Sequence, residues 1–166
     1  VIGKSDPNSN DFDIILFVDK SITKANIPPF IKKIESFAFE SCNELQTVIF
    51  SSNVTEIGER AFYNCSKLSL VTFPDDSNLR IIGKEAFKHS SLIKIEIPSH
   101  VVQIGVDVFS GCSQLTCVSF SEQPELEIID DGAFQNTKII HFFTPSNRAS
   151  AISSATSFSR WHRSPR

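Results

Sequence analysis

An internal repeat constrains this chain more than any other feature of its sequence. The repeated block begins with Ile, usually continues with Gly, and closes on Ala-Phe or Val-Phe; its copies read IESFAF, IGERAF, IGKEAF, IGVDVF and IDDGAF. Ile and Phe are five positions apart in every copy, and successive Phe residues follow at intervals of 23, 25, 22 and 25. A period of this length is typical of a solenoid in which each repeat forms one coil. We expect the block Phe residues to form its structural core: Phe39, Phe62, Phe87, Phe109 and Phe134.

A second pattern follows each block Phe and predicts the secondary structure of the coil. A small residue stands three positions on, an aliphatic residue five or six positions on, and a short alternating β-type stretch comes next. Such stretches are expected to stack at about 4.8 Å as a parallel sheet. The block itself is expected to form a helical or 3₁₀ turn, because Ile, Ala and Phe then share one face. Two residues after the Phe, the column Ser41, Asn64, His89, Gly111 and Asn136 suits a left-handed turn.

These patterns predict an α/β repeat fold. It is a right-handed solenoid with a parallel β-sheet on the concave face and short helical or 3₁₀ turns on the convex face. We divide the chain into an N-terminal lead-in and capping strand (1–21), a solenoid of about five repeats (22–145) and a Ser-rich basic tail (146–166), which composition predicts to be disordered.

The segment IGERAFYNCSKLSLVTFP, from Ile57 to Pro74, resembles the BspA-like leucine-rich repeat family. The resemblance covers roughly residues 22–145, and DFDIILFVDKSITKANIPPFIKKI looks like that family's lead-in. It implies a surface or secreted protein involved in adhesion to host cells, matrix proteins or other microbes. It supplies no catalytic residues, so we expect a non-enzyme. No signal peptide or membrane anchor is visible in this segment.

Charge and hydropathy narrow the range of partners. The formal net charge is −3, and the tail from Ser146 carries four Arg residues and no acid; removing those four charges leaves −7 for residues 1–145. A body of that sign repels phosphate backbones, so we expect no nucleic-acid partner. The longest apolar run, Ile14 to Val18, is too short for a membrane span.

Weak self-association through the last strand, Ile139 to Phe143, is also expected, because stacked sheets expose strand edges at their ends.

Candidate chemical groups have plainer structural interpretations. The column Cys42, Cys65, Ser90, Cys112 and Thr137 favours buried packing, with a Cys42–Cys65 disulfide and zinc as open alternatives. The four His residues fall in different repeat columns, and no nucleotide or metalloprotease motif is present. We therefore expect no cofactor, metal site or catalytic residue.

Two other sets of polar residues, the acids of the block turns and two asparagines, also have structural interpretations. The acids of the convex turns are expected to be solvated and to favour the first turn of short helices; they are Glu59, Glu85, Asp107, Asp130 and Asp131. A calcium or catalytic carboxylate pair is the alternative. Asn53 and Asn64 each begin an N-x-S/T sequon and are possible glycosylation sites.

The remaining candidate is a binding surface on the concave sheet. Alternate residues of a strand point outward, which places two columns of side chains on that face: Lys24, Asn26, Thr47, Ile49, Leu70, Thr72, Lys94, Glu96, Cys117, Ser119, His141 and Phe143. Apolar members among them suit a protein partner, such as a host or matrix protein or another cell-surface protein. The sequence thus predicts a protein-binding or adhesion module. The alternative is a structural spacer or truncated repeat segment without its own ligand.

Overall fold

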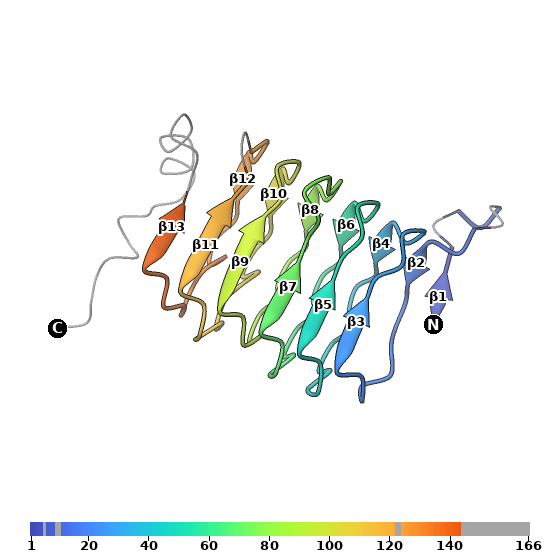
Figure 1. The fold of residues 1–166 in the computed structure, drawn as a ribbon, viewed down its shortest axis with the longest axis horizontal. Coiled ribbons are helices and arrows are strands. Elements are labelled where there is room, and N and C mark those ends of the chain that lie inside the picture. Colours follow the sequence, from blue (N-terminus) through green and yellow to red (C-terminus); the bar gives the residue numbers. More distant parts are fainter. Residues whose placement is uncertain (5, 9–10, 122–123, 144–166) are drawn as a thin grey trace.

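The computed structural model describes residues 1–4, 6–8, 11–121 and 124–143. Within those ranges the chain forms thirteen short strands and no helix. Each coil contributes one longer strand and one two-residue strand (Figure 1). The longer strands are β3 (Lys24–Asn26), β5 (Thr47–Ile49), β7 (Leu70–Thr72), β9 (Lys94–Ile97), β11 (Cys117–Phe120) and β13 (His141–Phe143). The two-residue strands are β1 (Ile2–Gly3), β2 (Ile14–Ile15), β4 (Lys33–Ile34), β6 (Glu56–Ile57), β8 (Ile81–Ile82), β10 (Gln103–Ile104) and β12 (Ile128–Ile129).

The two-residue strands form one seven-stranded sheet along the solenoid, in the order β1-β2-β4-β6-β8-β10-β12. From β2 to β12 the pairing is parallel, and only β1 runs antiparallel to its neighbour β2. The block Ile residues occupy the same register position in β4, β6, β8, β10 and β12, so each stacks on its equivalent in the next coil. The repeat phase read from the sequence therefore sets the sheet register.

The longer strands are also parallel, which confirms the parallel solenoid, but they form two sheets. One sheet has the order β3-β5-β7 and the other β13-β11-β9. Strands β7 and β9 lie side by side where the two sheets meet (Figure 1). The coil that ends in β9 is one residue shorter, because Leu92 follows Phe87 by five positions whereas Leu68 follows Phe62 by six. The coil that ends in β13 is shortened in the same way, since Ile139 follows Phe134 by five positions, yet β13 pairs with β11. The missing residue therefore does not by itself divide the sheet.

The segments that carry Ala-Phe are turns and not helices, contrary to the helical or 3₁₀ turns expected from the sequence. In the second copy, the amides of Arg60, Phe62 and Asn64 donate to carbonyls of the next coil at 2.9, 2.7 and 2.8 Å. The intervening amides of Ala61 and Tyr63 donate to carbonyls three residues back in the same coil. Every second amide is thus used between coils, whereas a helix would direct all of them along its own axis.

Left-handed residues produce this alternation. Arg60 has φ 53° and Asn64 has φ 55°, and both positions recur with positive φ in every copy of the block. Two such residues four positions apart interrupt the run of right-handed conformation that a helix needs. The second position agrees with the left-handed column expected from the sequence: Ser41, Asn64, His89, Gly111 and Asn136.

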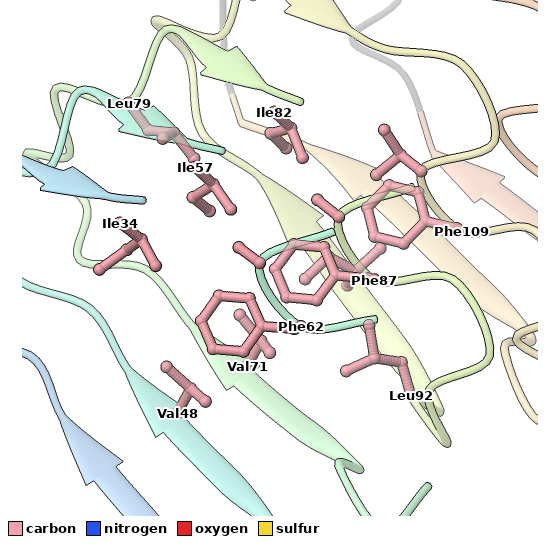
Figure 2. Close-up of a cluster of buried hydrophobic side chains, with 14 of the residues drawn as sticks. Ile34, Val48, Ile57, Phe62, Val71, Leu79, Ile82, Phe87, Leu92 and Phe109 are labelled. Atoms are coloured by element: carbon pink, nitrogen blue, oxygen red, sulfur yellow. The ribbon is translucent and has the colours of Figure 1, made fainter. Parts of the chain in front are cut away.

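The block Phe residues stack through the centre of the solenoid (Figure 2). Successive ring centroids from Phe39 to Phe134 are 4.6, 5.1, 5.7 and 5.3 Å apart, and each side chain is at most 4% exposed. Ile, Leu and Val residues of the repeat surround the stack and are buried as well. A coil alone would leave its Phe uncovered on two sides, so each coil depends on its neighbours for a core.

Close backbone contact between coils explains the Gly of the IG pairs. A Cβ built on Gly58, Gly83 or Gly105 would lie 2.6 to 2.9 Å from backbone atoms of the preceding coil. Real Cβ atoms do not approach backbone so closely, and backbone cannot swing aside as a side-chain end can. The recurrent Gly therefore serves close packing between coils.

The N-terminal segment packs against the first coil. β2 pairs in parallel with β4, and the amides of Lys32 and Glu35 donate to the carbonyls of Asp13 and Ile15 at 2.7 and 2.9 Å. β1 then pairs with the free edge of β2. In the described part of the chain, no helix has the length and hydropathy needed to span a membrane. The tail that the sequence predicts to be disordered (146–166) lies outside the described residues.

Candidate binding face

The outward side chains of the longer strands form two registered columns, as the sequence predicts. We call this surface the ladder face. In the first sheet, Lys24 pairs with Thr47 and Thr47 with Leu70, while Asn26, Ile49 and Thr72 form the second column. In the second sheet, the first column is Lys94, Cys117 and His141, and the second is Glu96, Ser119 and Phe143. The strand pairing therefore brings the predicted residues together as two adjoining ladders.

Most of these side chains are open to solvent. Ile49 is 38% exposed and Leu70 is 41% exposed, although both are aliphatic. Thr47, Cys117 and Ser119 are half-buried. Six further members are exposed: Lys24, Asn26, Thr72, Lys94, Glu96 and His141. The side chain of Phe143 lies outside the described part of the structure. The ladder face thus combines two exposed aliphatic groups with polar and charged neighbours.

Charged groups on the ladder face are not held in internal ion pairs. Among the described residues, no ion pair involves Lys24, Lys94 or Glu96. Elsewhere, charged residues on neighbouring coils pair repeatedly, as Lys67 does with Glu44 at 2.8 Å. The charges of the ladder face are therefore available to an external partner without first breaking an internal contact.

Sequence reasoning missed two apolar residues beside the ladder face. Ile93 is 55% exposed and Ile140 is 75% exposed, and each precedes a longer strand. Ile95 is buried, so strict alternation of inward and outward side chains predicts that Ile93 is buried too. Leu92 is the buried residue instead, and Ile93 faces solvent. The repeat column carried the missing signal, since the equivalent residues in other coils are the polar Gln46, Ser69 and Thr116.

The cysteines are free thiols in this structure. Cys65 and Cys112 are fully buried and donate from Sγ to the carbonyls of Phe39 and Phe87, both at 3.1 Å. Burial raises the pKa of Cys65 to about 12 and that of Cys112 to about 11. Cys42 is buried as well, and its pKa is likewise raised by desolvation. High thiol pKa values disfavour the thiolate that nucleophilic or metal chemistry needs.

The acidic residues of the block turns do not serve helix ends, because the turns are not helical. Glu85 is only 7% exposed and accepts from Arg60 and, at 3.3 Å, from Lys88. The hydrogen bond from Arg60 is the main cause that lowers the pKa of Glu85. Lys88 also donates to Asp107 at 2.8 Å, so the ion pairs link three coils. The helix-dipole explanation of these acids was wrong: ion pairing between coils replaces it for Glu85 and Asp107, whereas Glu59 and Asp131 are exposed.

The histidines occupy separate parts of the structure. His89 packs edge-on against Tyr63, and His100 contacts Glu125 at 2.9 Å. His141 is exposed on the ladder face, and His162 lies outside the described residues. Within the described ranges, no group of three or more His, Cys, Asp or Glu side chains is placed to hold a metal ion.

The two sequon asparagines differ in structural role. Asn53 is exposed, and its Nδ2 donates to the carbonyl of Pro29 at 2.6 Å. Asn64 is half-buried and holds the left-handed turn position after Phe62. Both asparagines thus contribute to coil geometry.

Comparison with protein families decides the identity of the repeat. The model described as a BspA type leucine-rich repeat region, in six copies, matches residues 11–80 and 32–160. The chain belongs to this family. The resemblance carried by the segment from Ile57 to Pro74 is thereby confirmed. A search of curated proteins finds no match.

Two solved structures of other leucine-rich repeat proteins share the fold of this BspA-type chain, and a third is reported beside them. The pneumococcal vaccine antigen PcpA has a TM-score of 0.64 and 21% identity, over 82% of this chain and 40% of that one. A leucine-rich repeat protein from Eubacterium ventriosum has a TM-score of 0.53 and 19% identity, over 82% and 49%. A leucine-rich cell surface protein from Faecalibacterium prausnitzii is 24% identical over 82% and 47%, with a TM-score of 0.49. The chain spans less than half the length of each of these proteins.

Proposed function

We propose that this BspA-type chain is a non-catalytic protein-binding or adhesion module that holds its ligand on the ladder face. The observation that carries the proposal is the registered ladder with exposed Ile49 and Leu70. Its lysine and glutamate side chains form no ion pair among the described residues. The partner is a host or matrix protein or another cell-surface protein. The chain acts at the cell surface or after secretion.

The architecture supports this proposal. In a repeat solenoid, stacked coils hold equivalent side chains at fixed spacing along an extended surface, so a partner meets a rigid array. Ile49 and Leu70 come from adjacent strands, β5 and β7, and therefore lie close enough to contact one apolar group of a partner. Polar neighbours such as Asn26 and Thr72 would then form the rim that surrounds such an anchor.

The family and the structural neighbours support the class of function and the location. BspA-type repeats are generally non-catalytic, and no cluster of His, Cys, Asp or Glu among the described residues is placed to hold a metal ion. One neighbour is described as a cell surface protein and another as a vaccine antigen. A surface location would place the ladder face where extracellular proteins can reach it.

A binding screen with charge-reversed variants tests the proposal. The chain is immobilised and probed with purified extracellular-matrix proteins and with host-cell surface extracts. Lys24→Glu combined with Lys94→Glu should weaken binding of the captured protein at least tenfold, because both side chains are exposed and each belongs to the first column of one of the two adjoining ladders. Their exposure should leave the melting temperature of the variant near that of the wild type.

The matched control reverses charge away from the ladder face. Lys84→Glu combined with Lys138→Glu changes net charge equally at exposed positions outside the longer strands. It should bind as the wild type does. If both double variants bind equally, or if the wild type captures no protein, the chain is better described as a structural spacer without its own ligand.

A further inference from the structure

Two neighbouring depressions lie on loops that join longer strands to two-residue strands and on the segment before β2. One, of about 490 Å³, is lined by Asp11, Phe12, Asp13, Pro29, Phe30, Lys32 and Asn53. The other, of about 460 Å³, is lined by Lys32, Asn53, Thr55, Asn78, Arg80, His100 and Glu125. Because Lys32 and Asn53 line both, the two depressions adjoin, and we call them together the loop groove. None of its lining residues belongs to the longer strands of the ladder face.

We propose that the loop groove is a second binding site, which takes a neutral oligosaccharide chain. A sugar presents hydroxyl groups that both donate and accept hydrogen bonds, together with an apolar face of C–H groups. A site for it needs mixed donors and acceptors, a flat apolar platform and no excess of one charge. The loop groove meets these three requirements.

Its neutral polar side chains offer donors and acceptors in fixed orientations. Asn53 and Asn78 donate from Nδ2 to the carbonyls of Pro29 and Ser52 in the preceding coil, at 2.6 and 3.1 Å. Thr55 donates in the same way to Lys32 at 3.2 Å. Each amide retains a second N–H and a carbonyl oxygen for a ligand. Side chains already held by the fold lose little conformational entropy when a ligand binds.

The charged lining residues are paired, which favours a neutral ligand. Lys32 contacts Asp13 at 3.2 Å. Glu125 contacts His100 at 2.9 Å and Arg80 at 3.5 Å. Cations and carboxylates therefore alternate along the loop groove and do not form the cluster of one sign that a sulfated or carboxylated polymer would require. Paired groups still present spare N–H donors and oxygen acceptors to hydroxyls.

An aromatic platform stands at one end. Phe12 is 49% exposed and Phe30 is 56% exposed, both far more than the block Phe residues. The ammonium of Lys4 lies 5.2 Å from the ring centroid of Phe12. Phe30 has no such cation, nor an aromatic neighbour, among the contacts of the described residues. A flat ring of this kind packs well against the C–H face of a pyranose.

The length of the loop groove favours a chain over a single sugar. Its lining residues come from successive coils, from the N-terminal segment before β2 to the segment before β12. Strands of neighbouring coils are about 4.8 Å apart, so the lining spans about 24 Å over five steps. A ligand of several sugar units would contact the aromatic platform and the amides together.

Binding to an array of purified oligosaccharides tests this proposal. The array holds neutral chains of mannose, glucose, galactose and N-acetylglucosamine units, single sugars, and sulfated or carboxylated polymers. The wild-type chain should bind at least one neutral chain more strongly than the corresponding single sugar. Phe30→Ala and Arg80→Ala should each weaken that binding at least tenfold in a titration with the neutral chain identified on the array.

Phe17→Ala is the matched control, because Phe17 is 57% exposed and does not line the loop groove. It should bind as the wild type does, and melting temperatures of all variants should remain close to the wild-type value. Absence of binding to every neutral chain would overturn the proposal. So would preference for anionic polymers, or equal binding by Phe30→Ala and Phe17→Ala. The ladder-face variants should leave sugar binding unchanged, so this test is independent of the proposed function.

Discussion

Phe62 and Phe87 lie 25 residues apart in the sequence, yet their rings stack at a centroid distance of 5.1 Å and only 2° from parallel. Both are fully buried, and Phe87 also stacks on Phe109 at 5.7 Å. Removing one ring therefore leaves a cavity between two others. Long aliphatic side chains of the repeat surround this stack on the remaining sides (Figure 2).

Phe87→Ala should lower the free energy of unfolding by about 3–5 kcal/mol, because it removes a ring from the stack and leaves a cavity. Phe17→Ala removes an equal ring that is 57% exposed, and should change stability by less than about 1 kcal/mol. Urea denaturation followed by circular dichroism measures both. Equal denaturation midpoints for the two variants would show that the Phe stack does not hold the coils together.

Gly83→Ala should destabilise the protein by about 1–3 kcal/mol. Its new Cβ would lie 2.8 Å from the carbonyl carbon of Gly58 and 2.9 Å from the amide nitrogen of Glu59, both in the preceding coil. Gly3→Ala is the control, since its Cβ would meet only the end of the Leu16 side chain at 3.0 Å and beyond. Thermal unfolding compares the two variants. A melting temperature for Gly83→Ala at or above that of Gly3→Ala would contradict the proposed contact between coils.

Cys65 should make stability fall at high pH. The folded-state pKa is about 12, against an ordinary value of 9.0, so the unfolded chain loses its thiol proton first. This contribution is complete below about pH 9 and is lost as pH rises toward 12, with about 1 kcal/mol lost by pH 10. Urea titrations at several pH values should show a shallower decline for Cys65→Ala than for the wild type. Parallel declines would argue against a buried, protonated thiol.

Glu85→Ala should cost about 1–3 kcal/mol at neutral pH, because it removes hydrogen bonds to Arg60 and Lys88. Since pairing lowers the pKa of Glu85, its contribution is present above the ordinary carboxyl value of 4.5 and is lost as pH falls through the folded-state value. The difference between the variant and the wild type should therefore shrink in acid. Glu59→Ala, at an exposed neighbouring position, is the control. A difference that stays constant from pH 7 to pH 2 would contradict this account.

The parallel coils could be predicted from the sequence because the same pattern of buried Ile and Phe recurs in five copies. Ile57 and Phe62 must turn inward in every coil, and the same positions recur in step. The register of both strand series follows from that recurrence. The ladder columns that contain Ile49 and Leu70 could be predicted for the same reason, since alternation holds within β5 and β7.

The turn backbone could not be predicted in the same way. Apolar spacing at Ile57, Ala61 and Phe62 is compatible with a helix, and the conformation is decided by bonds to the next coil. Arg60 has a positive φ although Arg does not favour one, so the residue type does not predict the left-handed conformation. The division between β7 and β9 also has no counterpart in the apolar spacing, and Ile93 turns outward against strict alternation.

The most direct test of the account removes the apolar anchor of the ladder face. The test variant combines Ile49→Asp with Leu70→Asp, whose side chains are 38% and 41% exposed. The matched control combines Ile81→Asp on β8 with Ile128→Asp on β12, whose side chains are 39% and 45% exposed. The dissociation constant of each variant for the protein captured by the wild type is measured by surface plasmon resonance. The account predicts at least a tenfold weakening for the ladder-face pair alone. Equal affinity of the two pairs would contradict it.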